Sequence, residues 1–265
     1  EIIKSTLTVN PNGGIYNNNS GLTYLVNDYG TIISLDTPVK EGYTFTGWTL
    51  TGDGSLSGNT YTYSDEDGEI SANYTPKTYT ITYNLNGGDV SGNPESYTIE
   101  SNDITLNNPS KTGYTFLGWT WEGQDTPTSV TIAKGSTGNR TYTANFEINK
   151  YTLTVNPNGG TYNNIAGLTY IENDYGTVIT LDTPEREGYT FTGWTLDGDG
   201  SLSNNIYTYE TGNGTVTANY TIDTYNITYD GLNDEEKDFL NLPISYTIED
   251  EIILPTPSNR LDDIS

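Results

Sequence analysis

The sequence predicts a mainly β protein made of several small modules in tandem, with little or no helix. Three observations support this. The chain of 265 residues repeats itself about every 73 residues, its segments alternate apolar and hydroxyl side chains, and only 32% of its residues are apolar although 23 are tyrosine. Such a low apolar content does not fit one large domain with a deep core. Abundant tyrosine and β-branched residues are typical of strands and not of disordered chains.

Three motifs define the repeat, and each occurs three times in the same order. They are Asn-x-Asn-Gly-Gly from Asn10, Asn84 and Asn156, Gly-Tyr-Thr-Phe-x-Gly-Trp from Gly42, Gly113 and Gly188, and Ala-Asn-Tyr/Phe from Ala72, Ala144 and Ala218. Their spacing predicts repeat A over 1–76, repeat B over 77–148, repeat A′ over 149–222 and a truncated, B-like fourth repeat over 223–265.

Repeats A and A′ are near copies, and their differences separate inside from outside. Between 21–63 and 167–209, 34 of 43 positions are identical. Three positions become acidic, which predicts that they face water: Val26 to Glu172, Val39 to Glu185 and Thr51 to Asp197. Two positions keep an apolar side chain of similar volume, which predicts burial: Leu25 to Ile171 and Ile32 to Val178.

Alternation with a period of two predicts the strands. In 79–83, for example, Tyr79, Ile81 and Tyr83 share one face. The expected strands are 22–26, 31–35, 43–50, 60–63, 70–74, 79–83 and 151–155. Clusters of Asn, Asp, Gly and Pro between them predict turns. In the fourth repeat, Asn233 precedes several acidic residues and predicts the N-cap of a short helix over 233–240.

Short linkers predict little freedom between neighbouring repeats. Four residues, 75–78, connect repeat A to repeat B, and another four, 147–150, connect repeat B to repeat A′. Pro76 stiffens the first linker. Since a compact module of this size is about 30 Å across, modules in series predict an elongated rod on the order of 100 Å.

The composition excludes several classes of function. The chain has no His and no Cys, which excludes a histidine general base, a thiolate nucleophile, disulfides and a structural zinc site. Its formal charge of −25 opposes binding to nucleic acids and to anionic membranes. No apolar run reaches the ~18–20 residues of a membrane span, so no membrane insertion is expected. Residues 1–4 do not resemble a secretory signal, and we expect the chain to be a piece of a longer protein.

The Gly-Tyr-Thr-Phe-x-Gly-Trp motif supplies the candidate core, because large aromatic side chains dominate the core of a small module. Gly47 predicts a bulge that aims Trp48 inward. Trp121 aligns with Leu50 and Leu196 and leaves two alternatives open, a substitution at the edge of the core or an exposed ring that stacks on a sugar or a protein partner. The expected core residues are Tyr43, Phe45, Trp48, Tyr114, Phe116, Trp119, Tyr189, Phe191 and Trp194.

Candidate sites for chemistry are weak, and no catalytic residue, cofactor or metal is predicted. The acidic run 65–69 has no counterpart in repeat A′ and is typical of a solvated turn rather than of a carboxylate pair for glycoside hydrolysis. Calcium is a minor alternative for this run and for 197–199, but a twelve-residue loop ending in Glu is missing.

An isopeptide cross-link between a lysine and an asparagine is another alternative. Its candidates are Lys77 and Lys150 with Asn73, Asn145 and Asn219. Alternation places Asn73 on the outward face, where the desolvation that such a reaction needs is absent.

The motif Gly-Tyr-Thr-Phe-x-Gly-Trp, preceded by Asp-Thr-Pro-x-x-Glu at 36–41, resembles the Listeria–Bacteroides repeat, also called the internalin B-repeat. The resemblance covers 1–222 as three units and continues as a truncated unit to Ser265. It implies a β-grasp-like fold, although the segment after the Trp lacks helix-forming residues and a mostly β unit is expected. In the fourth unit, 257–261 departs from the corresponding 109–113, and no Trp follows.

The resemblance implies a location on the bacterial surface or in the medium, and no catalytic residues. We therefore expect a non-enzymatic stalk that projects a distal domain, with flanking domains of a longer surface protein as its partners. The alternative is an adhesin module that itself binds a host glycan or protein through exposed aromatic side chains, Trp121 among them.

Overall fold

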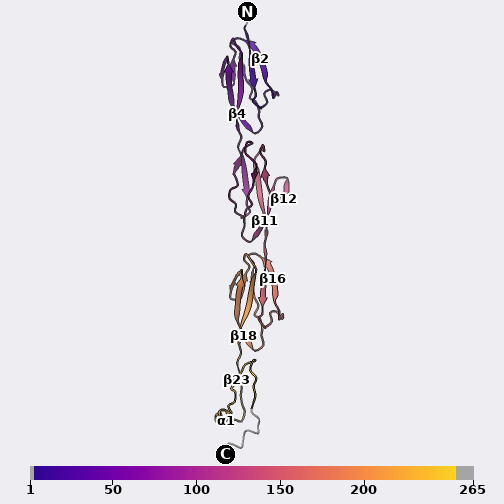
Figure 1. Cartoon of the computed structure of the whole chain (residues 1–265), viewed down its shortest axis with the longest axis vertical. Helices are drawn as coiled ribbons and strands as arrows, with labels where there is room; N and C mark the ends of the chain where they lie inside the picture. The colour runs from indigo at the N-terminus through magenta and orange to yellow at the C-terminus, as the bar shows by residue number, and fades with distance from the viewer. Residues whose placement is uncertain (1–2, 255–265) are drawn as a thin grey trace, which may run out of the picture. The chain divides into compact units, whose positions relative to one another are not determined.

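The protein consists almost entirely of short strands. The computed structural model describes residues 3–254 (Figure 1). These residues fall into two compact units, one of residues up to 111 together with 116–146, and one of 112–115 together with residues from 147 onward. The prediction of a mainly β protein is confirmed.

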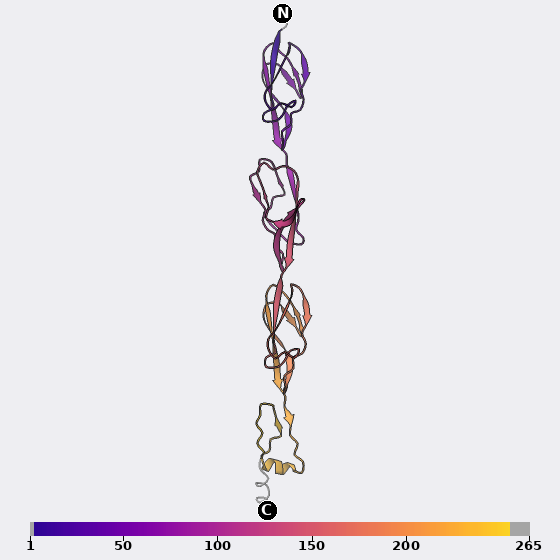
Figure 2. The same ribbon diagram turned by 90° about the vertical axis from the view of Figure 1, so that its right-hand side faces the viewer.

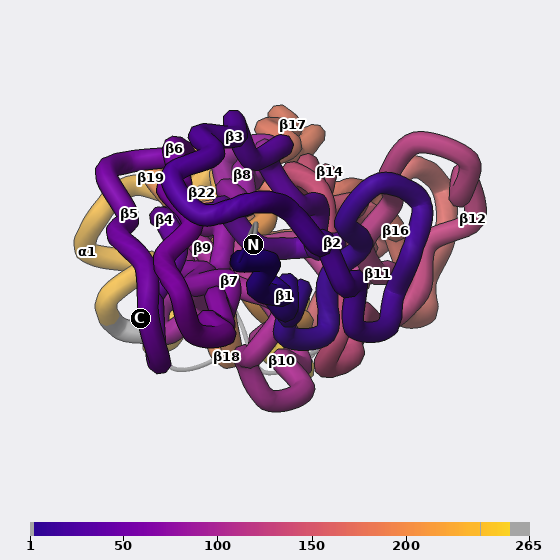
Figure 3. Tube along the Cα trace, turned by 90° about the horizontal axis from the view of Figure 1, so that it is seen from above, coloured from indigo at the N-terminus to yellow at the C-terminus, as the bar shows by residue number. Residues whose placement is uncertain are grey.

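Repeat A contains two sheets. One has four strands in the order β2-β1-β7-β4, and the other has three in the order β3-β6-β5. Seen end-on in Figure 3, β5 and β6 lie on the opposite side of the repeat from β2. The strands are β1 (Lys4–Asn10), β2 (Thr23–Asp28), β3 (Ile32–Ser34), β4 (Tyr43–Gly52), β5 (Ser55–Ser57), β6 (Thr60–Thr62) and β7 (Gly68–Pro76).

Repeat A′ has the same two sheets as repeat A. Their orders are β16-β15-β21-β18 and β17-β20-β19. The strands are β15 (Lys150–Asn156), β16 (Thr169–Asp174), β17 (Val178–Thr180), β18 (Tyr189–Gly198), β19 (Ser201–Ser203), β20 (Ile206–Thr208) and β21 (Gly214–Ile222).

Repeat B differs at the strand that follows the Trp motif. Its main sheet has five strands in the order β12-β11-β14-β8-β9, and β10 pairs with β13. The strands are β8 (Tyr79–Asn84), β9 (Ser96–Tyr97), β10 (Ile104–Thr105), β11 (Tyr114–Trp121), β12 (Gln124–Thr128), β13 (Thr131–Ile132) and β14 (Arg140–Ile148). Whereas β5 of repeat A joins the smaller sheet, β12 folds back onto β11.

The fourth repeat is described as far as residue 254. It has one pair of strands, β22 (Tyr225–Asn226) with β23 (Ser245–Tyr246), and the helix α1 (Asp234–Phe239), drawn in yellow in Figure 2. Asn233 is the N-cap, and it exchanges hydrogen bonds with Glu236 in a capping box. The predicted short helix is therefore confirmed, while the comparison of 257–261 with repeat B lies outside the described residues.

The first and last strands of each repeat run parallel to one another. In repeat A, β1 pairs with β7 so that Leu7 lies opposite Gly68, and β15 pairs with β21 in the same register. In repeat B, β8 pairs with β14. Because paired parallel strands point the same way, the chain enters a repeat at one end and leaves it at the other.

Three hydrophobic clusters form the cores, and each draws its residues from one repeat. Trp119 is fully buried, and Trp48 and Trp194 are 8% and 9% exposed. A register shift lies between Phe45 and Gly47, where β4 pairs with β7, so the predicted bulge is confirmed. Strict alternation would place Phe45 and Trp48 on opposite faces; the extra residue brings their rings to 5.2 Å between centroids in the same core.

The structure corrects two predictions about burial. Tyr43, Tyr114 and Tyr189 belong to none of the three clusters and lie half-buried beside the next repeat. Ile32 and Val178 are 67% and 60% exposed, because they lie on the outward face of a three-residue strand. The three positions that become acidic in repeat A′ are exposed in both copies, as predicted.

Two of the sequence motifs meet at a hydrogen bond that recurs in every complete repeat. The side-chain amide of Asn12 donates to the carbonyl of Ala72 at 3.0 Å, and the pairs Asn86–Ala144 and Asn158–Ala218 do the same at 2.8 and 2.9 Å. The asparagine has a positive φ of 47–49°, which this residue tolerates better than most. The Asn-x-Asn-Gly-Gly turn is thereby fixed to the last strand of its own repeat.

Replacing Trp119 by Ala tests how much one ring contributes to the core of repeat B. Burial is complete, so Trp119→Ala should lower the free energy of unfolding of this repeat by about 3–5 kcal/mol in urea denaturation. Leu117 is the matched control, because it lies on the same strand and is 48% exposed. Leu117→Ala should change stability by no more than about 0.5 kcal/mol, and equal losses for the two variants would contradict the assignment.

Candidate functional site

The junction between repeats A and B is a close contact around Gly42 and Tyr43. The backbone N–H of Lys77 donates to the carbonyl of Gly42 at 2.8 Å. The Tyr43 hydroxyl donates to the Glu100 carboxylate at 2.9 Å. Gly42 lies against Ile99 so closely that an added Cβ would be 2.5 Å from its Cδ1 atom. The glycine is therefore required by the neighbouring repeat as well as by its own φ of 75°.

The junction between repeat A′ and the fourth repeat has the same construction. Asp223 N–H donates to the Gly188 carbonyl at 2.9 Å, and the Tyr189 hydroxyl donates to the Glu249 carboxylate. Gly188 lies against Ile248, where an added Cβ would come within 2.7 Å. Residues 97–100 and 246–249 share the sequence Tyr-Thr-Ile-Glu, so one surface recurs on both B-type repeats.

The junction between repeats B and A′ uses a different partner for the same Gly-Tyr pair. Gly113 lies directly against the ring of Tyr175, and the ring of Tyr114 is 6.5 Å from it between centroids in an edge-to-face arrangement. The backbone N–H of Asn149 donates to Gly113 at 2.9 Å, and its side chain accepts a hydrogen bond from Thr115. The structure therefore contains two kinds of junction.

One basic side chain per repeat supports the Gly-Tyr end. Lys40 donates to the carbonyl of Asn12 at 3.2 Å and lies 4.5 Å from the centroid of the Tyr43 ring. Arg186 does the same in repeat A′, with its guanidinium 3.8 Å from the Tyr189 centroid. A cation over an aromatic face is favourable by about 0.5–1 kcal/mol at an exposed site. Three of the ten basic residues, Lys111 being the third, thus contact the Asn turn.

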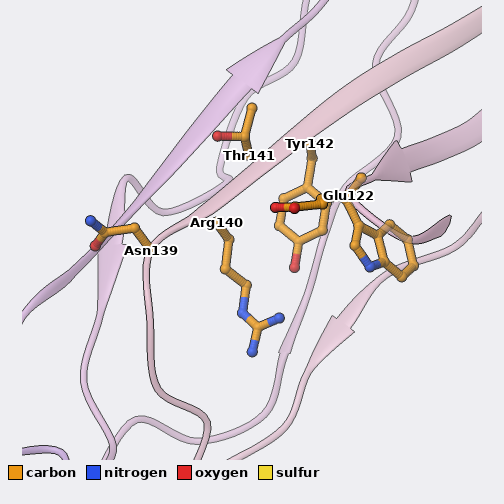
Figure 4. A pocket seen from close by; sticks show the side chains of 6 residues that line it. Glu122, Asn139, Arg140, Thr141 and Tyr142 are labelled. Carbon is orange, nitrogen blue, oxygen red and sulfur yellow. The ribbon is translucent and has the colours of Figure 1, made fainter.

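A cleft lies beside Trp121, one of the predicted site residues. It has a volume of about 260 Å³ and is lined by Trp121, Glu122, Asn139, Arg140, Thr141 and Tyr142. Figure 4 shows the side chains of Arg140 and Tyr142 on one side of β14 and that of Thr141 on the other. Trp121 is half-buried, packs against the core of repeat B, and meets Tyr142 edge-to-face at 5.6 Å.

Hydrogen bonds hold Arg140, one of the residues that line this cleft. Arg140 Nε donates to the Tyr97 hydroxyl at 3.1 Å, which raises the pKa of the guanidinium further. Tyr97 in turn donates to the carbonyl of Gly138 at 2.6 Å, so the arginine is held in place. An aromatic ring beside fixed donors and acceptors is able to contact one sugar ring, though the volume is below the roughly 300 Å³ at which small-molecule sites begin.

The cleft depends on the feature that sets repeat B apart. In repeat A, β4 continues beside β7 to the pair Gly52–Gly68. In repeat B, the chain turns back at Gly123, and β12 pairs with β11 across a register shift between Trp119 and Trp121. The hairpin leaves Trp121 half-buried at the rim of the core, as expected for a substitution at the edge of the core, and the stacking of its ring on a sugar or a protein partner stays a prediction.

The acidic run of repeat A is connected to β1 by a hydrogen bond. Asp67 accepts a hydrogen bond from the Thr6 backbone at 2.6 Å, and Asn213 accepts one from Thr152 in repeat A′. A hydrogen bond from Ser64 holds the pKa of Asp53 below its usual range. Within residues 3–254, no three acidic side chains come close enough together to hold a metal ion.

The asparagines considered for cross-linking are engaged locally. Asn73 is exposed, as predicted, and donates to the Thr49 hydroxyl at 2.8 Å. Asn219 donates to Thr195 at 2.7 Å in the same way. These contacts join neighbouring strands of one sheet and involve no lysine.

Comparison with known proteins agrees with the repeat pattern. The model of the Listeria-Bacteroides repeat domain matches residues 6–75 and 79–146, about half of the chain. The chain belongs to this family. The model of the divergent InlB B-repeat domain matches 151–224, so all three complete repeats are covered.

Three curated relatives extend the comparison. A putative Gly-rich membrane protein of Evansella cellulosilytica is 28% identical over 84% of the chain and 26% of its own length. A putative membrane protein of the same organism is 29% identical over 95% of the chain and 37% of its own length. Internalin H of Listeria monocytogenes is 32% identical over 42% of the chain and 20% of its own length. The chain thus spans about a third or less of each relative. Within residues 3–254, no helix has the length and hydropathy that a membrane span requires.

Sequence reasoning missed the residues that receive the Gly-Tyr pairs. These are Ile99, Glu100, Tyr175, Ile248 and Glu249. The recurrence of Tyr-Thr-Ile-Glu in the two B-type repeats was the available signal, since both copies contact the preceding repeat.

The half-buried Tyr83, which lies opposite Tyr142 in the pairing of β8 with β14, predicts a loss of stability at alkaline pH. Burial raises the pKa of Tyr83 to about 12, with Tyr142 adding to the effect. The unfolded phenol titrates near pH 10. The folded state therefore holds its proton more tightly, and this contribution is complete below about pH 10 and is lost as the pH rises through about 12.

Urea denaturation between pH 8 and 12 measures this loss. Tyr83→Phe should flatten the fall in unfolding free energy above pH 10, at a uniform cost of about 1 kcal/mol for the lost hydrogen bond to Pro94. Identical slopes for the variant and the unsubstituted chain would show that Tyr83 does not titrate as described.

Proposed function

We propose that the chain is a non-enzymatic spacer of an extracellular bacterial surface or secreted protein, which holds flanking domains apart. The observation that carries the proposal is the parallel pairing of the first and last strands in each complete repeat. A repeat with this pairing adds length between the segments before and after it, whereas a repeat whose ends lie together would add almost none.

The strand register gives the size of this separation. Lys4 and Pro76 are about eleven residue steps apart along the direction shared by β1 and β7. At about 3.3 Å per residue, one repeat therefore separates its two ends by about 36 Å. Repeats A′ and B follow the same rule, with registers that differ by at most one step.

The junctions support the proposal because each joins successive repeats through several contacts. Each combines a backbone hydrogen bond to a glycine carbonyl with an aromatic side chain that contacts the following repeat. Repulsion between the acidic repeats also favours separation of the flanking domains, but its effect is weaker. The Debye length is about 10 Å at 0.1 M salt, so repulsion between repeats about 36 Å long is largely screened.

A second function is favoured by the cleft beside Trp121. Its half-buried indole, the fixed Arg140 and the carboxylate of Glu122 form an asymmetric polar hollow, and the positions that align with Trp121 in repeats A and A′ are Leu50 and Leu196. We propose, as the alternative to a pure spacer, that repeat B binds a host glycan or a protein there.

Small-angle scattering tests the spacer function. The whole chain should give a maximum dimension on the order of 100 Å. Its radius of gyration should lie well above the value of about 18 Å that a compact chain of this length has. Gly42→Ala should broaden the distance distribution because the added Cβ meets Ile99. Gly30→Ala is the control, since Gly30 has a φ of 76° and no atom near an added Cβ. A compact particle, or equal effects of the two variants, would count against the spacer.

A glycan array tests the alternative. If the cleft binds a sugar, Trp121→Ala should lose most of the signal, because stacking of a ring on an aromatic side chain is lost. Leu117→Ala, on the outer face of the same strand, should bind as the unsubstituted chain does. Binding that is indifferent to Trp121, or no binding at all, would remove the binding of a glycan in this cleft.

A further inference from the structure

Tyr29 and Tyr175 occupy equivalent places in repeats A and A′ and are held by the same framework. Both lie in the sequence Asn-Asp-Tyr-Gly. The backbone N–H of Tyr29 donates to the Ile3 carbonyl at 2.9 Å, and that of Tyr175 donates to Asn149 at the same distance. Beside them, the ion pairs Lys4–Asp28 and Lys150–Asp174 measure 3.2 and 3.1 Å.

The two rings differ in what covers them. Tyr175 is half-buried against Gly113 and Tyr114 of repeat B. Tyr29 is 64% exposed, and Ile3 beside it is 52% exposed. Because the framework is the same and the ring is uncovered, repeat A presents a surface equivalent to the one that contacts Gly113 and Tyr114 in repeat A′.

We propose that the surface formed by Ile3, Asp28 and Tyr29 binds the Gly-Tyr end of a B-type repeat that is joined to it in the same polypeptide. The chemistry of the occupant follows from the Tyr175 junction. A glycine is needed where the ring lies against the backbone, because a Cβ on Gly113 would enter the ring of Tyr175. A tyrosine follows it and meets the ring edge-to-face.

A backbone hydrogen bond at the same junction indicates that the occupant is joined to repeat A in one polypeptide. Asn149 precedes β15 and donates to the Gly113 carbonyl while accepting from Tyr175, so the linker residue itself is part of the contact. Ile3 has the equivalent position before β1, and its carbonyl already accepts from Tyr29. The chain spans 26% and 37% of the length of two relatives, so each of these relatives has sequence outside the matched part.

The two kinds of junction then impose an order on the repeats. Repeats A and A′ present a tyrosine ring to the preceding repeat, whereas B-type repeats present an Ile-Glu pair. The proposal goes beyond the spacer function and does not depend on it, because an adhesin made of the same repeats would need the same contact.

Tyrosine nitration followed by peptide mass spectrometry tests the proposal. In the chain as it stands, Tyr29 should react about as fast as Tyr24, which is also 64% exposed, while Tyr175 should react several-fold more slowly than Tyr170, which is 66% exposed. The chain is then extended by a second copy of 77–148 placed before residue 3. In the extended chain, the nitration rate of Tyr29 relative to that of Tyr24 should fall to the value found for Tyr175 relative to Tyr170.

Two variants of the added copy distinguish its contact with Tyr29 from covalent attachment alone. Gly113→Ala in that copy should restore the reactivity of Tyr29, because its Cβ would occupy the place of the ring. Gly123→Ala is the control with a similar φ of 80° and no atom near an added Cβ, and it should leave Tyr29 protected. A Tyr29 that stays reactive in the extended chain, or protection that Gly113→Ala does not remove, would overturn the proposal.

Discussion

The parallel pairing of the first and last strands of each repeat is the constraint on which the rest depends. Pairing β1 with β7, in the register that sets Leu7 opposite Gly68, lets the last strand continue well beyond the first. The Asn turn after β1 then lies beside that continuing strand, where Asn12 reaches the carbonyl of Ala72. The end of β7 is thereby carried to the far side of the repeat, next to the Gly-Tyr pair that contacts the following repeat. Core, turn and junction all follow from one register.

At each junction, the glycine that the local backbone requires is also a contact point for the next repeat. Gly42, Gly113 and Gly188 begin the aromatic motif with a positive φ, and each also has a neighbour from the next repeat where a Cβ would stand. The tyrosine after each glycine is therefore a contact residue, although the motif groups it with Phe and Trp. One motif thus has two structural roles. Its Phe and Trp pack in the core of their own repeat, and its Tyr contacts the next repeat.

Repeat B shows how a small change in pairing adds a surface to a shared framework. Its hairpin folds β12 onto β11, and the ring that replaces Leu50 and Leu196 is left at the rim of the core beside Arg140. The change leaves the parallel pairing of β8 with β14 intact. Variation in the segment after the Trp motif therefore changes a surface without altering the way the chain passes through the repeat.

The sequence by itself determined where strands occur and which of their faces point inward. Ile81 is buried between exposed neighbours, and the positions that become acidic in repeat A′ are exposed in both copies, because alternation fixes the face of each side chain. It did not determine which strands pair, and so it missed β5, the parallel register and the partners of Tyr43 and Tyr114. It also misjudged Ile32, because similar volume in two copies does not distinguish a buried position from an exposed one. The parallel pairs and the junctions join residues that are about 60 apart in the chain, and the pattern within one strand carries no information about its neighbour, so only the tertiary structure decided them.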